Sequence, residues 1–133
     1  MDLFTAMDIS ASGMRAQRTR MNIISSNIAN ANTTRTEEGG PYKRRDVIFR
    51  ENSFEKQLSS VEVEAIVEDP TQGNSIFNPG NPDADEDGYV TMPNVNIMEE
   101  MVNMVGATRA FEANTTAIKA QKDMALRALS IGR

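Results

Sequence analysis

The chain has 133 residues, a formal net charge of −5, and neither cysteine nor histidine. Without these side chains, disulfides and thiolate metal sites are excluded and the commonest general base is missing, so catalysis is not expected. Thirteen of its acidic residues fall between 37 and 96, and no basic face could neutralise phosphates, which argues against a nucleic-acid partner.

Residues 3–29 are predicted to form a helix, because apolar residues recur along them at spacings of three and four. Small residues such as Gly13 and Ala16 lie beside this seam and would let another backbone approach closely. Ser10 and Gln17 interrupt the seam, which favours packing among several helices from more than one copy over a simple two-helix hairpin. The apolar seam positions, expected to form an assembly interface, are Leu3, Met7, Met14, Met21, Ile24 and Ile28.

The middle of the chain reads as strands and turns. Residues 25–34 are rich in Ser, Asn and Thr, which compete for backbone hydrogen bonds and so predict the exit from the helix. Residues 42–50 and 60–68 read as strands, the second alternating apolar and mostly acidic positions. Residues 89–92 are a plausible third strand, because two strands seldom stand alone. A long Pro-, Gly- and Asn-rich loop is expected at 70–88.

A second long helix is predicted from 97 to 129. Asn96 and Glu99 have the spacing of a capping box at its start, and Gly132 stands where the helix should stop. Met98, Val102 and Val105 form a further apolar stripe beside its main seam. The apolar positions expected to form the assembly interface on that seam are Ile97, Met101, Met104, Phe111, Ile118 and Leu129.

These elements predict a mainly α protein with a small β middle. The two terminal helices are expected to pair as a coiled coil, with a short antiparallel β-rich domain between them. The expected divisions are an N-terminal helix and its exit at 1–36, a small β-rich outer domain with an acidic loop at 37–93, and a C-terminal helix at 94–133.

One stretch invites a metal interpretation. Residues 83–88 read DADEDG, with acids at the first, third and fifth positions and Gly at the sixth, as in an EF-hand calcium loop. Asn94 stands at the twelfth position in place of a bidentate Glu, Pro82 and Pro93 flank or enter the loop, and no helix is predicted on either side. A solvated acidic turn is therefore favoured, and a small calcium-binding module at 83–94 is kept as an alternative. A cytosolic helical secretion adaptor is the other alternative.

Both ends of the chain resemble the bacterial flagellar basal-body rod family. The resemblance rests on SNIANANTT at 26–34, VNIMEEMVNM at 95–104 and RAFEAN at 109–114. The stretches TRTEEGGPY at 34–42 and NPDADEDGYV at 81–90 narrow it to the proximal-rod branch. The motif residues are Asn27, Ile28, Ala29, Asn30, Asn32, Thr33, Glu99, Glu100, Met101, Arg109, Phe111, Glu112 and Asn114.

The resemblance implies a non-enzymatic structural subunit without a cofactor, whose terminal helices form the inner layer of a helical tube. It implies contacts with other copies, with the rod proteins FlgB, FlgF, FlgG and FliE, and with the flagellar type III export apparatus. Nucleic acid and direct membrane insertion are not expected. Ordinary targeting rules predict a cytoplasmic protein, because no apolar run is long enough for a membrane span or a signal peptide. The family implies instead export without a cleaved signal and a place in the rod across the periplasm.

Overall fold

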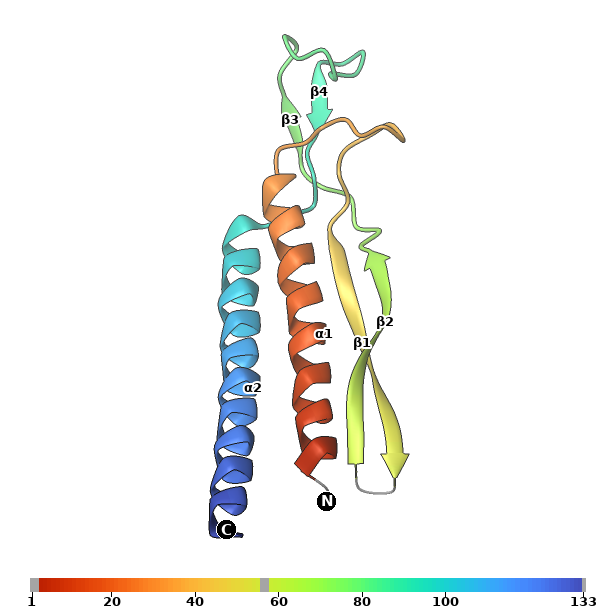
Figure 1. Ribbon diagram of the computed structural model, residues 1–133. Helices are drawn as coiled ribbons and strands as arrows, with labels where there is room; N and C mark the ends of the chain where they lie inside the picture. Colours follow the sequence, from red (N-terminus) through yellow and green to blue (C-terminus); the bar gives the residue numbers. More distant parts are fainter. Residues whose placement is uncertain (1–2, 56–57, 133) are drawn as a thin grey trace.

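The computed structural model describes residues 3–55 and 58–132 and has three layers (Figure 1). Helix α1 lies in the middle, with α2 on one side and a two-stranded ribbon of β1 and β2 on the other. A second small ribbon of β3 and β4 stands beyond the C-terminal end of α1. The elements are α1 Leu3–Ala29, β1 Arg45–Glu55, β2 Leu58–Glu68, β3 Ser75–Phe77, β4 Tyr89–Thr91 and α2 Ile97–Ile131.

The two helices confirm the sequence prediction closely. Helix α1 has the predicted bounds, and α2 begins at the predicted residue and runs two residues further, to Ile131. Asn96 has extended backbone angles (φ −99°, ψ 108°), and its side-chain oxygen accepts a hydrogen bond from the Met98 amide at 3.1 Å. This satisfies one of the amides that the first helical turn leaves without an intrahelical partner. Neither helix contains a stretch apolar enough to cross a membrane within the described residues.

Strands β1 and β2 form an antiparallel ribbon that lies along α1. The pairing runs from Arg45 opposite Glu68 to Glu55 opposite Leu58, and its register shifts after Ile48. The ribbon twists so that its strands cross in Figure 1. The first strand was predicted at 42–50 but begins three residues later, since the Tyr42 hydroxyl bonds to Asn27 of α1 and the Arg44 amide bonds to the Asn94 side chain. A two-stranded ribbon is marginally stable alone, and here it packs against α1.

The predicted third strand is present, and it belongs to a separate ribbon. Tyr89–Thr91 forms a strand, but it pairs with Ser75–Phe77 in a separate ribbon. Strand β3 lies inside the segment that was expected to be a loop, and three residues are too few to show a periodic pattern. The ribbon is closed by an edge-to-face contact between Phe77 and Tyr89, whose ring centroids are 5.3 Å apart. Gly88 closes its turn with φ of +83°, a conformation that favours glycine.

Helices α1 and α2 pair within the chain and run antiparallel, as Figure 1 shows. Their seam is more polar than the apolar positions suggested. The Thr108 hydroxyl lies 3.6 Å from the Met21 sulfur, and the Gln121 amide donates to the Ser10 hydroxyl at 3.5 Å. Gly13 faces the Asn114 side chain closely. Ser10 and Gln17 were expected to weaken such a pair, and the Gln17 side-chain oxygen is indeed buried without a hydrogen-bond partner among the described residues.

Candidate functional site

A fully buried polar side chain lies near the end of α1. Asn27 is fully buried, and its carboxamide uses all four of its hydrogen-bonding positions. Its nitrogen donates to the Arg45 carbonyl at 2.8 Å and to Glu100 Oε2 at 2.9 Å. Its oxygen accepts from the Tyr42 hydroxyl and from the Arg45 amide, both at 3.0 Å. Asn27 thus joins α1 to the backbone edge of β1 and to α2.

Glu100, in the first turn of α2, accepts this hydrogen bond from Asn27 and is also fully buried. Its second oxygen, Oε1, accepts from Arg44 Nε at 2.7 Å. Arg44 also donates to Asp46 at 3.2 Å, with its side chain about one-fifth exposed. Burial acts to lower the pKa of Arg44, but the hydrogen bonds to Glu100 and Asp46 outweigh it and raise the pKa above its ordinary value. The Glu100 carboxylate also lies at the positive end of the α2 dipole. Its buried negative charge is therefore compensated both by Arg44 and by the helix dipole.

Asn94 extends these contacts to the second strand at the same end of the ribbon, where Arg45 pairs with Glu68. Its oxygen accepts from the Arg44 amide at 2.7 Å, and its nitrogen donates to the carbonyls of Asp69 at 3.2 Å and Thr71 at 2.9 Å. The entrance to β1, the exit from β2 and the approach to α2 are therefore tied together. We call this set the junction; its members are Asn27, Tyr42, Arg44, Arg45, Asn94 and Glu100.

The junction gives two of the family-motif residues a structural role that sequence reasoning missed. Asn27 and Glu100 were picked out only as parts of motifs, and they lie 73 positions apart in the chain. The signals in the sequence were an Asn two residues before the end of the first helix and a second Glu in the first turn of the last helix. Neither signal predicted that these two residues would contact each other.

The remaining motif residues shape the helix exit, pack between the helices, or face solvent. Asn30 donates to the Ser26 carbonyl and accepts from the Thr33 hydroxyl, so these residues form the exit turn. Asn114 donates to the Ala110 carbonyl and lies against α1. Ile28 and Phe111 are half-buried, and the exposed motif residues are Ala29, Asn32, Glu99, Met101, Arg109 and Glu112.

The predicted interface seams divide between the inside and the outside of the folded chain. Ile24 is buried, and the exposed members are Ile97, Met101 and Leu129. The half-buried members are Leu3, Met7, Met14, Met21, Ile28, Met104, Phe111 and Ile118. Many seam residues are thus partly used within one chain, and their role in contacts between subunits stays a prediction.

The acidic loop uses its carboxylates to hold its own turn. Asp83 accepts from the Thr34 hydroxyl at 2.8 Å and lies 3.7 Å from the Arg35 guanidinium. Asp85 Oδ1 accepts from the amides of Asp87 and Tyr89. Asn94, the candidate twelfth ligand, belongs to the junction instead. Within the described part of the chain no cluster of acidic residues is arranged to hold a metal ion, and the calcium interpretation gains no support.

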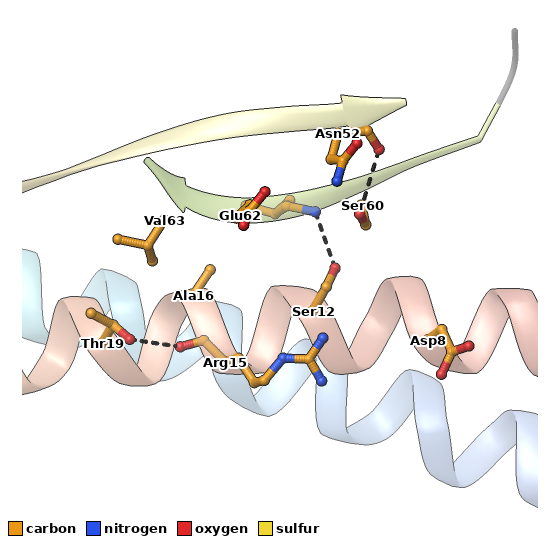
Figure 2. Close-up of a pocket in the computed structure, with 10 residues that line it drawn as sticks. Asp8, Ser12, Arg15, Ala16, Thr19, Asn52, Ser60, Glu62 and Val63 are labelled. Atoms are coloured by element: carbon orange, nitrogen blue, oxygen red, sulfur yellow. Dashed lines mark hydrogen bonds between the residues drawn. The ribbon is translucent and has the colours of Figure 1, made fainter. Parts of the chain in front are cut away.

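A cavity of about 480 Å³ lies between α1 and the far end of the ribbon (Figure 2). Its lining mixes charges, with Asp8 and Arg15 from α1 and Glu62 from β2. Ser12 is buried at its wall, where its hydroxyl donates to the Ile9 carbonyl and accepts from the Val61 amide at 3.1 Å. With both bonds made, this serine holds the ribbon edge to α1 and is not arranged as a nucleophile.

Comparison with known proteins places these features in a family. The family model "Flagella basal body rod protein" matches residues 7–35, and the model "Flagellar basal body rod FlgEFG protein C-terminal" matches 86–131. The flagellar basal-body rod protein FlgC of Bacillus subtilis is 41% identical, with the whole of both chains covered. FlgC of Salmonella typhimurium is 37% identical over the whole of both chains. FlgC of Aquifex aeolicus is 44% identical over 93% of this chain and 92% of its own. Asn27 lies in the first matched segment and Glu100 in the second.

Proposed function

The chain belongs to the FlgC family of flagellar basal-body rod proteins, and on this premise we propose how it works as a structural subunit of the rod. Its terminal helices form the inner layer of the tube, and the ribbons between them lie outside. This arrangement keeps the divisions expected at 1–36, 37–93 and 94–133. The rod transmits the torque of the motor, so rigidity is the property that its subunits must supply.

The observation that carries this proposal is the buried hydrogen bond between Asn27 and Glu100. It joins the two segments that the family models match, one from each end of the chain. A buried polar group that is fully paired specifies one arrangement, because any other arrangement leaves donors or acceptors unpaired. The junction therefore fixes the angle between helix pair and ribbon, which a torque-bearing subunit requires.

The partners follow from the same premise. We propose that the chain contacts other copies of itself and the rod proteins FlgB, FlgF, FlgG and FliE. Residues 86–131 match a model of the FlgEFG C-terminal segment, and we propose that α2 packs in the same layer of the rod as the corresponding segments of FlgF and FlgG. We further propose export through the flagellar type III apparatus without a cleaved signal, and a position in the rod where it spans the periplasm. Catalysis has no part in this function, which agrees with a chain that lacks histidine and cysteine.

The helix seams provide the test of assembly. Phe111 is the largest side chain of the C-terminal seam and is half-buried. Phe111→Asp removes roughly 1.5–3 kcal/mol of apolar burial and adds the cost of a poorly solvated charge, so rods should be lost while export continues. Glu64→Ala, on the exposed face of β2, is the control and should leave rods normal.

The experiment combines swimming motility, recovery of basal bodies and detection of the secreted variant. Wild-type chain should be found in purified basal bodies, and cells that lack it should be non-motile. Motile cells with normal rods that contain the Phe111→Asp chain would show that this seam is not an assembly interface. Absence of the wild-type chain from basal bodies would overturn the proposed function itself.

A further inference from the structure

The ribbon of β1 and β2 meets α1 with a different strand at each of its ends. At the end near the junction, the amide and the carbonyl of Arg45 both bond to the Asn27 side chain, so the outer edge of β1 faces α1. Toward the other end, the Val61 amide donates to the Ser12 hydroxyl at 3.1 Å, so the outer edge of β2 faces α1 there. We call the contact between Asn27 and Arg45 the near anchor, and the contact between Ser12 and Val61 the far anchor.

The exchange of edges follows from the twist of the ribbon. Arg45 lies opposite Glu68 and Val61 lies opposite Glu51, and the register shift after Ile48 falls between these two pairs. Two-stranded ribbons twist strongly, and an irregularity in the register increases the twist locally. The strands accordingly cross along their length in Figure 1. One ribbon therefore presents opposite edges to the same helix.

On α1 the two anchors use one face of the helix. Ser12, Ala16 and Asn27 are three of the four buried residues of α1. At about 100° per residue, these three fall within roughly 60° of one another around the helix axis. At about 1.5 Å per residue, Ser12 and Asn27 lie about 22 Å apart along that axis. The ribbon thus spans several turns of α1 and is attached at both ends of that span.

Together the two anchors prevent the ribbon from sliding or rolling on α1. In an antiparallel ribbon, the backbone groups of every second residue point away from the partner strand. A slide by one residue would place Asp46 and Ser60 at the anchors, and the backbone groups of these residues point toward the partner strand. A roll of the ribbon about its own axis would turn both anchoring edges away from the helix at once.

We propose that the ribbon is a torsional brace of α1, that is, an element attached at two points that resists twisting of the helix between them. A rotation of one end of α1 relative to the other would carry Ser12 or Asn27 away from the strand that it holds. The inference deepens the proposed function and rests on it, because resistance to twisting is what a torque-bearing subunit requires. It gives β1 and β2 a mechanical role within the single chain.

The far anchor is the weaker of the two. Ser12 makes one hydrogen bond to the ribbon, whereas the Asn27 carboxamide makes two to Arg45 and two more to Tyr42 and Glu100. The cavity of about 480 Å³ lies beside Ser12 (Figure 2), so the ribbon has room to move there once this bond is lost. Loss of the Ser12 hydroxyl should therefore turn the brace into a hinge about the near anchor.

Spin labels on introduced cysteines test this directly, because the chain has no cysteine of its own. Labels at Arg18 and Ser53 join α1 to the far end of the ribbon, and labels at Arg18 and Lys43 join α1 to the near end; all three residues are exposed. Double electron–electron resonance measures the distance distribution of each pair in the folded chain. In Ser12→Ala, the distribution of the far pair should broaden, while that of the near pair stays as narrow as in wild type.

Thr19→Ala is the matched control. Thr19 lines the same cavity, and among the described residues its hydroxyl bonds only to the Arg15 carbonyl of its own helix. Both distance distributions should therefore stay unchanged in this variant. Ser12→Ala deletes a single oxygen atom and should lower the melting temperature by only a few degrees. A serine that stabilised the fold without bracing it would lower the melting temperature and leave the far distance distribution of the folded chain unchanged.

Hydrogen exchange gives a second measurement that needs no label. The Val61 amide should exchange about fivefold faster in Ser12→Ala than in wild type, because it loses its acceptor. The Arg45 amide, which belongs to the near anchor, should exchange at the wild-type rate.

The inference is overturned if the far pair is as narrow in Ser12→Ala as in wild type, or if the near pair broadens equally. A Val61 amide that exchanges at the wild-type rate in this variant would overturn it as well. All of these measurements use the single chain in solution, so their failure would leave the rod function standing. Absence of the wild-type chain from purified basal bodies would instead refute the proposed function, and the measured mechanics of the single chain would stand.

Discussion

Replacement of Asn27 by Asp tests the junction with almost no change in shape. The substitution exchanges the donating nitrogen for an oxygen, so the Arg45 carbonyl and Glu100 Oε2 each lose a donor. A buried acceptor left unpaired costs about 1–3 kcal/mol. A new carboxylate would also face the Glu100 carboxylate in a site without water contact. We expect the free energy of unfolding at pH 7 to fall by about 3–5 kcal/mol, a large share of the stability of a domain of this size.

The pH dependence of this loss identifies its cause. Burial and the neighbouring carboxylate raise the pKa of the new carboxyl group in the folded state above its unfolded value of about 3.9. The folded variant then binds a proton more tightly than the unfolded one, so its stability relative to wild type recovers as the pH falls through the raised pKa. Urea unfolding, followed by circular dichroism, measures the unfolding free energy that Asn27→Asp loses relative to wild type. This loss should be smaller at pH 5 than at pH 7 by about 1–2 kcal/mol.

Two further variants make the result decisive. Asn27→Ala removes the same donors without adding a charge, so its loss should be nearly equal at the two pH values. Asn22→Asp changes an exposed residue of the same helix and should shift stability by less than about 0.5 kcal/mol. An Asn27→Asp chain that unfolds within about 0.5 kcal/mol of wild type, or that shows the same pH dependence as Asn27→Ala, would refute the account of the junction.

Two other predictions concern the helices and the exit from β2. Gly106→Ala should raise the free energy of unfolding by about 0.5–1 kcal/mol, because a Cβ there meets nothing within 4 Å and alanine favours the helix. Gly13→Ala should bring no such gain, since its Cβ would lie 2.9 Å from the Asn114 side-chain nitrogen; urea unfolding of both variants measures the difference. Hydrogen bonds from Thr71 lower the pKa of Asp69 in the folded state. The stabilisation that these bonds give is present at a pH above the unfolded-state pKa of Asp69, and it is lost as the pH falls through the lower folded-state pKa. Asp69→Asn should therefore show a flatter decline of melting temperature between about pH 5 and pH 2.5, and a decline as steep as that of wild type would contradict this assignment.

Phe111 and Val102 both lie on α2 but differ in burial, so an aspartate should affect the single chain differently at the two positions. Phe111 is half-buried within the single chain, so Phe111→Asp should lower the stability of the chain as well as its assembly. Val102 is largely exposed, so Val102→Asp should leave the melting temperature of the single chain nearly unchanged. Thermal unfolding of the two soluble variants separates the effects, and an equal drop in melting temperature for both would contradict the assignment of faces on α2.

The sequence by itself determined the elements whose causes are local. The bounds of α1, the start of α2 and the cap at Asn96 were predicted correctly, because helical periodicity and capping depend on residues a few positions apart. The two main strands were predicted with three of their ends displaced by two to five residues, and the end of β2 at Glu68 was predicted correctly. The family was also identified from the sequence, and full-length similarity to FlgC proteins confirms that identification.

The tertiary structure alone decided which residues meet. It placed Met98 and Val102 outside, brought Ser75–Phe77 into a strand, and joined Asn27 to Glu100 across 73 positions. In the sequence, Asn27 looks like any other polar residue of a helix exit, and Glu100 looks like any other acid of a first helical turn. A hydrogen bond between them depends on the direction in which each helix leaves its loop, and that direction is set by the packing of α1 between α2 and the ribbon.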